Sequence, residues 1–430
     1  MCRHRWRRCG RVSLASLVLV FLPAVSLAQA RSDSPRPPTL ITSEQAVQLA
    51  LEHNQTLRAN RLNIDQSRAN EVTAGLKPNP VVTSTNADFP VFTPSQISLP
   101  NTQTYTESLS YLFERGGKRE KRVVVARDTT EATVKTVDDA ERQIRFQVQQ
   151  AFIAVLLAKS NLDLAQQDLK DFGEVVTIDK QRMASGDISE GDYLKIALQK
   201  LQLEQDVSAA EVSLVQGKAV LRQLVGYETV ADDFDVAGTL AHQKYALALA
   251  DLQQQALAAR PDLLAASINT RLANNTVALA FGNRAPDLTG EVEYDRNGPV
   301  NGIGFGFSIA LPIHNRNQGE IARSEVAVRQ ARESESAARV TVLTDVANAY
   351  AGFQTNEKVV SLFESGYLDQ ASQSREISTY AYRRGASSLL DLLDAERTYR
   401  ATELAYRQAL AAYMTGAAQI NFVVGRQVIQ

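Results

Sequence analysis

The chain has 430 residues, enough for several domains or for one very elongated body. Hydrophobic residues make up 44% of it and charged residues 22%, which excludes general disorder and a polytopic helical membrane protein. Five arginines lie in the first thirty residues, and the remainder carries a net charge of −7. A net-acidic body cannot supply the phosphate neutralisation that nucleic-acid binding requires, so no nucleic-acid partner is expected.

Residues 1–30 have the features of a signal peptide. The arginines precede an apolar stretch from Val12 to Leu27, and Ala28-Gln29-Ala30 has the small-x-small form that a signal peptidase recognises. An uncleaved membrane anchor is the alternative, and the break at Pro23 disfavours it. Both cysteines lie in this segment, so the mature chain has no disulfide and no thiolate metal ligand. A linker, 31–43, is predicted to follow.

The mature chain's prolines cluster in stretches where polar and apolar residues alternate, which is typical of half-buried strands. The alternation predicts two β-hairpins, at 80–113 and 287–311. Their strands have about the 9 to 11 residues that cross an outer membrane in a tilted barrel. After residue 30 no apolar run approaches the ~20 residues of a membrane helix, so strands are the expected membrane-spanning part. A soluble β-subdomain with one apolar face stays open as an alternative.

Two long tracts contain no proline, from Asn101 to Arg260 and from Ile313 to the end. Because proline costs roughly 3 kcal/mol inside a helix, long helices are expected in these tracts. Apolar residues of the first tract recur at spacings of three, four and seven, which predicts a helix from about Arg119 to Met183. At 1.5 Å per residue it would be roughly 100 Å long, which indicates a coiled-coil-like tube.

The sequence also indicates an internal duplication. Ala50-Leu51 recurs 206 positions later as Ala256-Leu257, and Gly186 recurs 199 positions later as Gly385, where each long hairpin is predicted to turn. Each half reads as helix, β-hairpin and long helical hairpin. The predicted organisation is a first repeat, a linker, a second repeat and a C-terminal tail, at 44–235, 236–246, 247–425 and 426–430.

Four strands per chain cannot close a barrel, because the smallest known barrels have about eight. An unclosed sheet in lipid would leave its edge groups without hydrogen bonds, so the chain is expected to form oligomers. Three copies would supply twelve strands and a matching ring of helices. The predicted fold class is therefore an α+β membrane protein, with a periplasmic α-barrel and a trimeric 12-stranded outer-membrane β-barrel.

Four segments together resemble the TolC family of outer-membrane efflux proteins, and the resemblance spans residues 44 to 425. They are LSYLFERGGKR (109–119), PIHNRNQGE (312–320), Tyr382 to Gly385 and SLLDLLDAER (388–397). The R-G-G-K-R and N-R-N-Q-G-E portions are similar to the heavy-metal branch, the cobalt-zinc-cadmium resistance components.

This resemblance implies a homotrimeric channel in the outer membrane that docks on a periplasmic membrane-fusion (adaptor) protein and an inner-membrane RND pump. The expected function is export of divalent heavy-metal cations. An exit duct for drugs or type I secreted proteins is the alternative within the family. A periplasmic coiled-coil adaptor without a pore ranks lower, because it would have one helical hairpin rather than two.

The resemblance also implies roles for residues near the predicted turns. Asp391 and Asp394 match an acidic pore constriction, and Tyr382 with Asp192 matches a gate latch. Solvated positions on a helix face are the alternative for the two aspartates. The residues expected at the hairpin tips, where an adaptor would bind, are Arg182, Gly186, Arg383, Arg384 and Gly385.

No metal site, cofactor or catalytic centre is expected. The mature chain has three histidines, His53, His242 and His314, and none lies three or four residues from another. A high-affinity zinc or copper site needs convergent imidazole or soft ligands, which this spacing does not offer. A metal-exporting channel would need no such site, because selectivity can reside in the pump. Phosphate-loop, H-E-x-x-H and G-x-S-x-G motifs are absent, so the chain is not expected to be an enzyme.

Overall fold

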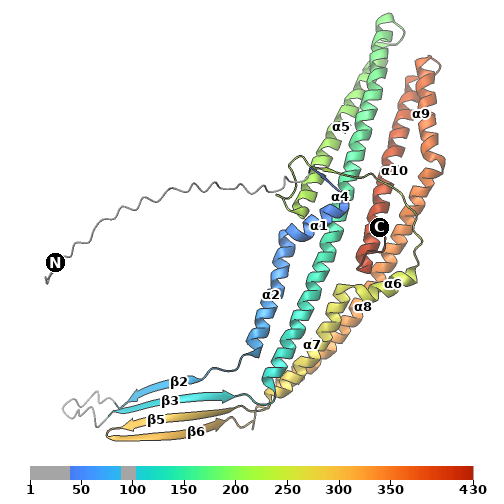
Figure 1. The fold of residues 1–430 in the computed structure, drawn as a ribbon. Coiled ribbons are helices and arrows are strands. Elements are labelled where there is room, and N and C mark those ends of the chain that lie inside the picture. The colour runs from blue at the N-terminus through green and yellow to red at the C-terminus, as the bar shows by residue number, and fades with distance from the viewer. Residues whose placement is uncertain (1–38, 89–102, 430) are drawn as a thin grey trace, which may run out of the picture. The chain divides into compact units, whose positions relative to one another are not determined.

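The computed structural model describes residues 39–88 and 103–429, and most of them are helical (Figure 1). The predicted signal peptide and most of the predicted 31–43 linker lie outside the described residues, as does the connection between the first two strands of the sheet. Within the described ranges no helix is both long and apolar enough to cross a membrane.

The first half of the chain contains two short helices, a β-hairpin and a long helical hairpin. Its elements in order are β1 (Leu40–Ile41), α1 (Ser43–His53), α2 (Gln55–Gly75), β2 (Val81–Ala87), β3 (Thr104–Phe113), α4 (Lys118–Ser185), α5 (Glu190–Val225) and β4 (Asp235–Val236).

The second half repeats this order, which confirms the predicted duplication. Its elements are α6 (Leu249–Ala259), α7 (Pro261–Asn283), β5 (Leu288–Asn297), β6 (Val300–Ile309), α8 (Gln318–Leu362), a π-helical turn (Phe363–Tyr367), α9 (Leu368–Arg383) and α10 (Leu389–Val424). The exact repeat boundaries proposed from the sequence stay a prediction.

The long helix expected from Arg119 to Met183 is confirmed, because α4 runs without interruption from Lys118 to Ser185. It stops at Gly186, whose φ of 84° is left-handed. Glycine adopts that conformation without the penalty that a Cβ would impose. The Gly186 N–H contacts the carbonyl of Met183 at 3.1 Å, and the chain then reverses into α5.

The corresponding helix of the second half is not continuous, which the sequence reading did not anticipate. A π-helical turn separates α8 from α9, and within it Gly366 has a φ of 124°. This backbone conformation is accessible to glycine and cannot continue an α-helix. At the equivalent place in the first long helix, 198 to 199 residues earlier, lie Gln167 and Asp168, and the only glycine within that helix, Gly173, stays helical.

The strands predicted within 80–113 and 287–311 are found, and they form one antiparallel sheet in the order β2-β3-β5-β6. The two hairpins join through β3 and β5. Leu109 lies opposite Val292, which lies opposite Phe305, so one face of the sheet is apolar. Phe305 and Phe307 are each 82% exposed. The other face carries polar and small residues, among them Ser108, Glu293 and Gly304.

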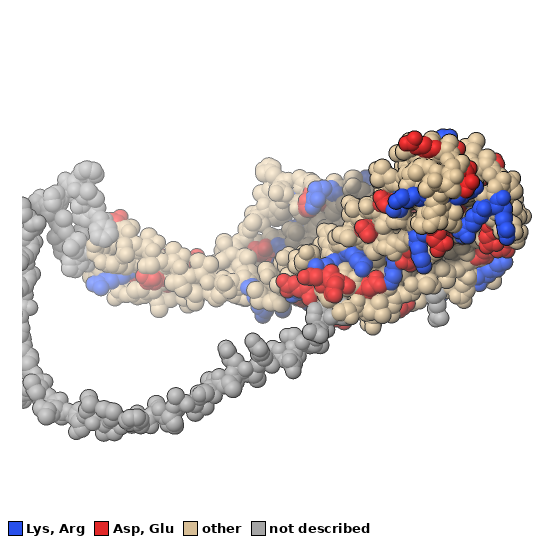
Figure 2. Space-filling model, turned by 90° about the horizontal axis from the view of Figure 1, so that it is seen from above, with Lys and Arg blue, Asp and Glu red and all other residues tan. Residues whose placement is uncertain are grey.

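Each half has its own apolar core where the short helices meet the long ones. The first centres on Phe152 with Val155 and Leu221, and the second on Phe353 with Tyr413. In contrast to these cores, the surface of the helical part carries acidic and basic side chains side by side (Figure 2). This mixture agrees with the nearly balanced charge of the sequence.

The two halves build the same junction with different residues. Asn54 separates α1 from α2, and Arg260 separates α6 from α7. The Asn54 Nδ2 donates to the Leu224 carbonyl at 2.9 Å, near the end of α5. Arg260 instead lies against Gly425 at the end of α10 and binds carboxylates. The second junction is therefore held by ion pairs, whereas the first is held by a hydrogen bond from an amide side chain.

Candidate functional site at the hairpin tips

The tip of the first hairpin packs against the second hairpin through apolar residues. Val175 of α4, Tyr382 of α9 and Leu392 of α10 form one buried cluster. A second cluster joins α4 to α5 through Phe172 and Ile196. The apolar contacts bring polar side chains of α4 and α9 into reach of one another near both turns.

Tyr382 hydrogen-bonds across this contact. Its hydroxyl donates to Oδ2 of Asp179 at 3.0 Å, and the two residues are 6% and 0% exposed. Oδ1 of Asp179 lies 3.3 Å from the Arg182 guanidinium, which also lies over the Tyr382 ring. Burial raises the pKa of Tyr382 to about 12, and the negative charge of Asp179 adds to that shift. The phenol therefore stays protonated and remains the donor.

Within this chain the Tyr382 hydroxyl bonds Asp179 and not Asp192, and the latch role of Tyr382 with Asp192 stays a prediction. Asp192 lies in the first turn of α5, where its backbone N–H bonds the side chain of Ser189. Its carboxylate accepts from Lys195 at 3.0 Å and from Ser189 at 2.8 Å, and these bonds lower its pKa. Asp192 is thus engaged in capping its own helix. Asp179 instead accepts the hydrogen bond of Tyr382.

Asp391 and Asp394 both lie on the exposed side of α10 in the single chain. Asp391 forms a capping box with Ser388, in which its Oδ2 accepts from the Ser388 hydroxyl at 2.8 Å and from the Ser388 N–H at 3.1 Å. These bonds lower the pKa of Asp391. Asp391 therefore has a local role that needs no pore, and the constriction role stays a prediction.

The remaining predicted tip residues lie at or beside the turns. Gly385 adopts a left-handed φ of 74° between α9 and α10, and Gly186 is likewise left-handed between α4 and α5. Arg383 pairs loosely with Glu174 at 3.8 Å, and Arg384 lies over the Tyr380 ring. Both arginines are exposed, whereas Arg182 is directed inward to Asp179.

The two segments that resemble the heavy-metal branch converge at the end of α7. Gly116 has a φ of 72°, and a Cβ there would come within 2.5 Å of the Gly282 carbonyl. From the other segment, Asn317 donates its Nδ2 to the Ala280 carbonyl at 2.7 Å. Lys118 adds an ion pair with Asp287 at 2.7 Å. These residues thus fix the junction between the sheet and the helices.

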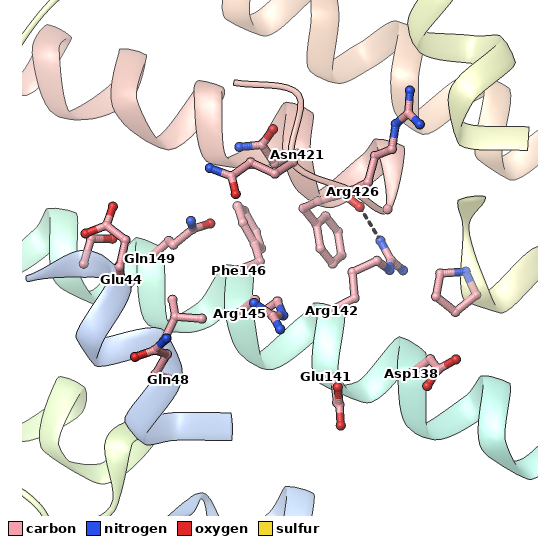
Figure 3. Close-up of a pocket in the computed structure, with 16 residues that line it drawn as sticks. Glu44, Gln48, Asp138, Glu141, Arg142, Arg145, Phe146, Gln149, Asn421 and Arg426 are labelled. Atoms are coloured by element: carbon pink, nitrogen blue, oxygen red, sulfur yellow. Dashed lines mark hydrogen bonds between the residues drawn. The ribbon is translucent and has the colours of Figure 1, made fainter. Parts of the chain in front are cut away.

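A cavity of about 510 Å³ lies between α1, α4 and the C-terminal end of α10 (Figure 3). Arg142 projects beside it, stacks on the Phe422 ring and donates to the Phe422 carbonyl at 2.7 Å. Arg142 also pairs with Asp139 at 2.6 Å, and Asn421 binds the following backbone at Val428. Arg142 thus holds the two halves together, whereas Asn421 holds the C-terminal segment against the end of α10.

The three histidines of the mature chain lie in separate elements. His53 ends α1 and His314 precedes α8, whereas His242 lies between the repeats with its Nδ1 2.8 Å from Glu364. Among the described residues no group of three or more His, Cys, Asp or Glu side chains is arranged to hold a metal ion.

The geometry of two helical hairpins on a four-stranded sheet is shared with known proteins. Residues 46–227 and 252–426 match the family described as outer membrane efflux protein, which covers well over half of the chain. The chain belongs to the outer membrane efflux protein family. This family is one of efflux channels rather than enzymes, and its members are located in the outer membrane with a helical domain in the periplasm.

Individual members of the outer membrane efflux protein family resemble the chain over most of their length. The cobalt-zinc-cadmium resistance protein CzcC of Cupriavidus metallidurans is 25% identical over 90% of both chains. A membrane protein from Pseudomonas aeruginosa has a TM-score of 0.76 at 19% identity, and the channel CusC has a TM-score of 0.74 at 19% identity. Each alignment covers 89% of this chain and 92% of the other. These structures confirm the predicted TolC-like fold.

Proposed function

We propose that the protein is the outer-membrane exit channel of a tripartite RND-type efflux system that exports divalent heavy-metal cations. The observation that supports this most directly is the similarity to the cobalt-zinc-cadmium resistance protein along 90% of the chain. The structure supplies no metal site among its described residues, so the proposal assigns metal selectivity to the pump.

The proposed channel is a homotrimer. Within one chain β2 and β6 each have one neighbour, so the outer edge of each strand carries unpaired backbone groups. The apolar face of the sheet is exposed, as expected of a surface in contact with lipid. Joining β6 of one copy to β2 of the next would pair these edges, and three copies would give twelve strands.

The proposed partners are a periplasmic adaptor and an inner-membrane RND pump. The adaptor would bind at the hairpin tips, where Arg383 and Arg384 are exposed beside the Gly385 turn. Gly186 marks the equivalent turn of the first hairpin. Arg182 is a weaker candidate for adaptor contact, because its guanidinium is paired with Asp179 inside the tip.

Asp391 and Asp394 are proposed to form the acidic constriction of the trimer. The double change Asp391→Asn with Asp394→Asn should lower the cation-to-anion permeability ratio in planar bilayers severalfold, because up to six carboxylates would leave one ring. Asparagine keeps a side-chain oxygen that can accept from Ser388 as the Asp391 carboxylate does. Asp192→Asn, at the matching position of α5, is the control and should leave the ratio unchanged. An unaltered ratio in the double variant would remove the constriction role.

Deletion of the gene tests the proposed substrate class. The deleted strain should lose several-fold in its tolerance of zinc, cobalt or cadmium salts and little in its tolerance of hydrophobic drugs, because only the exit step for cations is lost. Expression of the wild-type chain should restore tolerance. Greater sensitivity to drugs than to metal salts would instead favour the drug-duct alternative.

A further inference from the structure

An acidic pair, with Asp168 buried and Glu396 half-buried, lies between the two hairpins and away from the Tyr382–Asp179 contact. Asp168 of α4 is 7% exposed, and its Oδ2 has no hydrogen-bond partner among the described residues. Asp168 and Glu396 of α10 line the same cavity, together with Gln199 and Leu203 of α5. The cavity measures about 20 Å³, which is enough for one water molecule.

Charged groups face Asp168 from α4, α9 and α10, and most have their own partners. From α9, Arg375 lies 3.8 Å from Asp171 of α4 and stacks on the Tyr399 ring. From α10, Arg400 binds Asp206 of α5 at 2.7 Å. The other charged groups around the pair are Arg397, Glu403 and Arg407 of α10.

Burial, and not these charged neighbours, shifts Asp168 towards its neutral form. Burial raises the pKa of Asp168 to about 6, although Arg400 and Arg375 act in the opposite direction. Burial also raises the pKa of Glu396. A carboxyl whose pKa is raised by packing binds a proton more tightly in the packed state than when exposed. Packing of α4 on α10 is therefore most stable below about pH 4, and it weakens as the pH rises from about 4 to about 6.

We propose that Asp168 and Glu396 form a proton-binding site that holds the two hairpins together when protonated and lets them separate when both carboxylates are ionised. A protonated Asp168 can donate its O–H towards Glu396, directly or through one water in the cavity. Ionisation of both would place two like charges on opposite hairpins with few hydrogen bonds to satisfy them. Two carboxylates beside Arg397 and Arg400 suit a proton better than a divalent cation.

Conductance measurements test the proton-binding site. The site itself does not depend on the proposed channel function, but this measurement does. The wild-type channel in planar bilayers should conduct more at pH 8 than at pH 5, and the rise should be complete just above the pKa of Asp168. The shift from 3.8 to about 6 corresponds to a closing bias of roughly a hundredfold per chain over the whole titration, of which roughly tenfold lies between pH 5 and pH 8. Asp168→Asn, which mimics the protonated form, should keep the low conductance at both pH values. Asp163→Asn, at an exposed position of α4, should behave as wild type.

A spin-label distance measurement tests the proton-binding site without relying on ion conduction. Ala184→Cys and Ala386→Cys place nitroxides on the exposed tips of the two hairpins of the detergent-purified chain, diluted with unlabelled chains. The distance between them should increase from pH 5 to pH 8 in the wild-type background and stay constant with Asp168→Asn.

The outcomes separate the two proposals. A protein that conducts no ions but shows the pH-dependent distance would contradict the channel proposal alone. A channel whose conductance and tip distance ignore pH, or follow pH equally with and without Asp168→Asn, would overturn the proton site. A pH response that persists with Asp168→Asn and Glu396→Gln but disappears with Asp391→Asn would do the same.

Discussion

Asp179→Ala should open the hairpin tip and raise single-channel conductance. The change removes the acceptor of the Tyr382 hydroxyl and the partner of Arg182 together, and it leaves a buried phenol and a partly buried guanidinium unpaired. Breaking a buried pair of this kind costs about 3 kcal/mol. We expect a cost nearer to about 2 kcal/mol here, because the Arg182 side chain retains some contact with water. If three copies surround one axis, the cost is repeated three times, which favours the open state strongly.

Two further variants make this prediction specific to the latch. Tyr382→Phe removes a single hydrogen bond, so it should raise conductance less than Asp179→Ala, with a cost of roughly 1 kcal/mol per chain. Asp192→Ala should change conductance little, because Asp192 caps α5 and does not contact Tyr382. A larger effect of Asp192→Ala than of Asp179→Ala would restore the pairing inferred from the sequence.

Arg260→Ala should destabilise the second half of the protein more than changes at surface ion pairs do. Arg260 is 3% exposed, and its guanidinium binds Asp262 at 2.6 Å and Asp345 at 2.8 Å. Its loss removes the partner of Asp345 and leaves Asp262 only the more distant Arg142, 3.9 Å away, at the α6–α7 junction. We expect the free energy of unfolding to fall by about 3 kcal/mol.

Thermal unfolding followed by circular dichroism in detergent measures this effect. Arg323→Ala is the matched control, because Arg323 forms an exposed pair with Glu320 in the same half of the chain and should leave the transition midpoint nearly unchanged. Equal midpoints for Arg260→Ala and Arg323→Ala would mean that the junction is held by packing around Gly425 and not by charge.

The sequence predicted the features that depend on local chemistry. The uninterrupted α4 follows from the absence of proline and interior kinks, and the reversal at Gly186 follows from glycine's access to positive φ. Strand alternation predicted the apolar face that contains Leu109 and Phe305, because side chains point to opposite faces with a period of two. The duplication was readable because equivalent elements have kept residues at nearly constant separation.

Contacts between the hairpins depended on the tertiary structure. Tyr382 and Asp179 are 203 residues apart, and their pairing depends on the rotation of α4 and α9 about their own axes. Spacing from the turn could place Asp192 near the tip but could not show that its carboxylate was already used as a cap. The break at Gly366 likewise depends on a φ value that glycine permits without requiring it.

The sequence by itself therefore determined the two-fold repeat, the long helices, the strands and the family, because these depend on backbone preferences and hydrophobic period. Only the tertiary structure decided which polar groups are buried between the hairpins. Asp168 looks like a solvated helix residue in the sequence, yet it is enclosed by α5 and α10. Burial changes the free energy of ionising its carboxyl group. The spacing of residues along one helix does not show which residues of another hairpin pack against it.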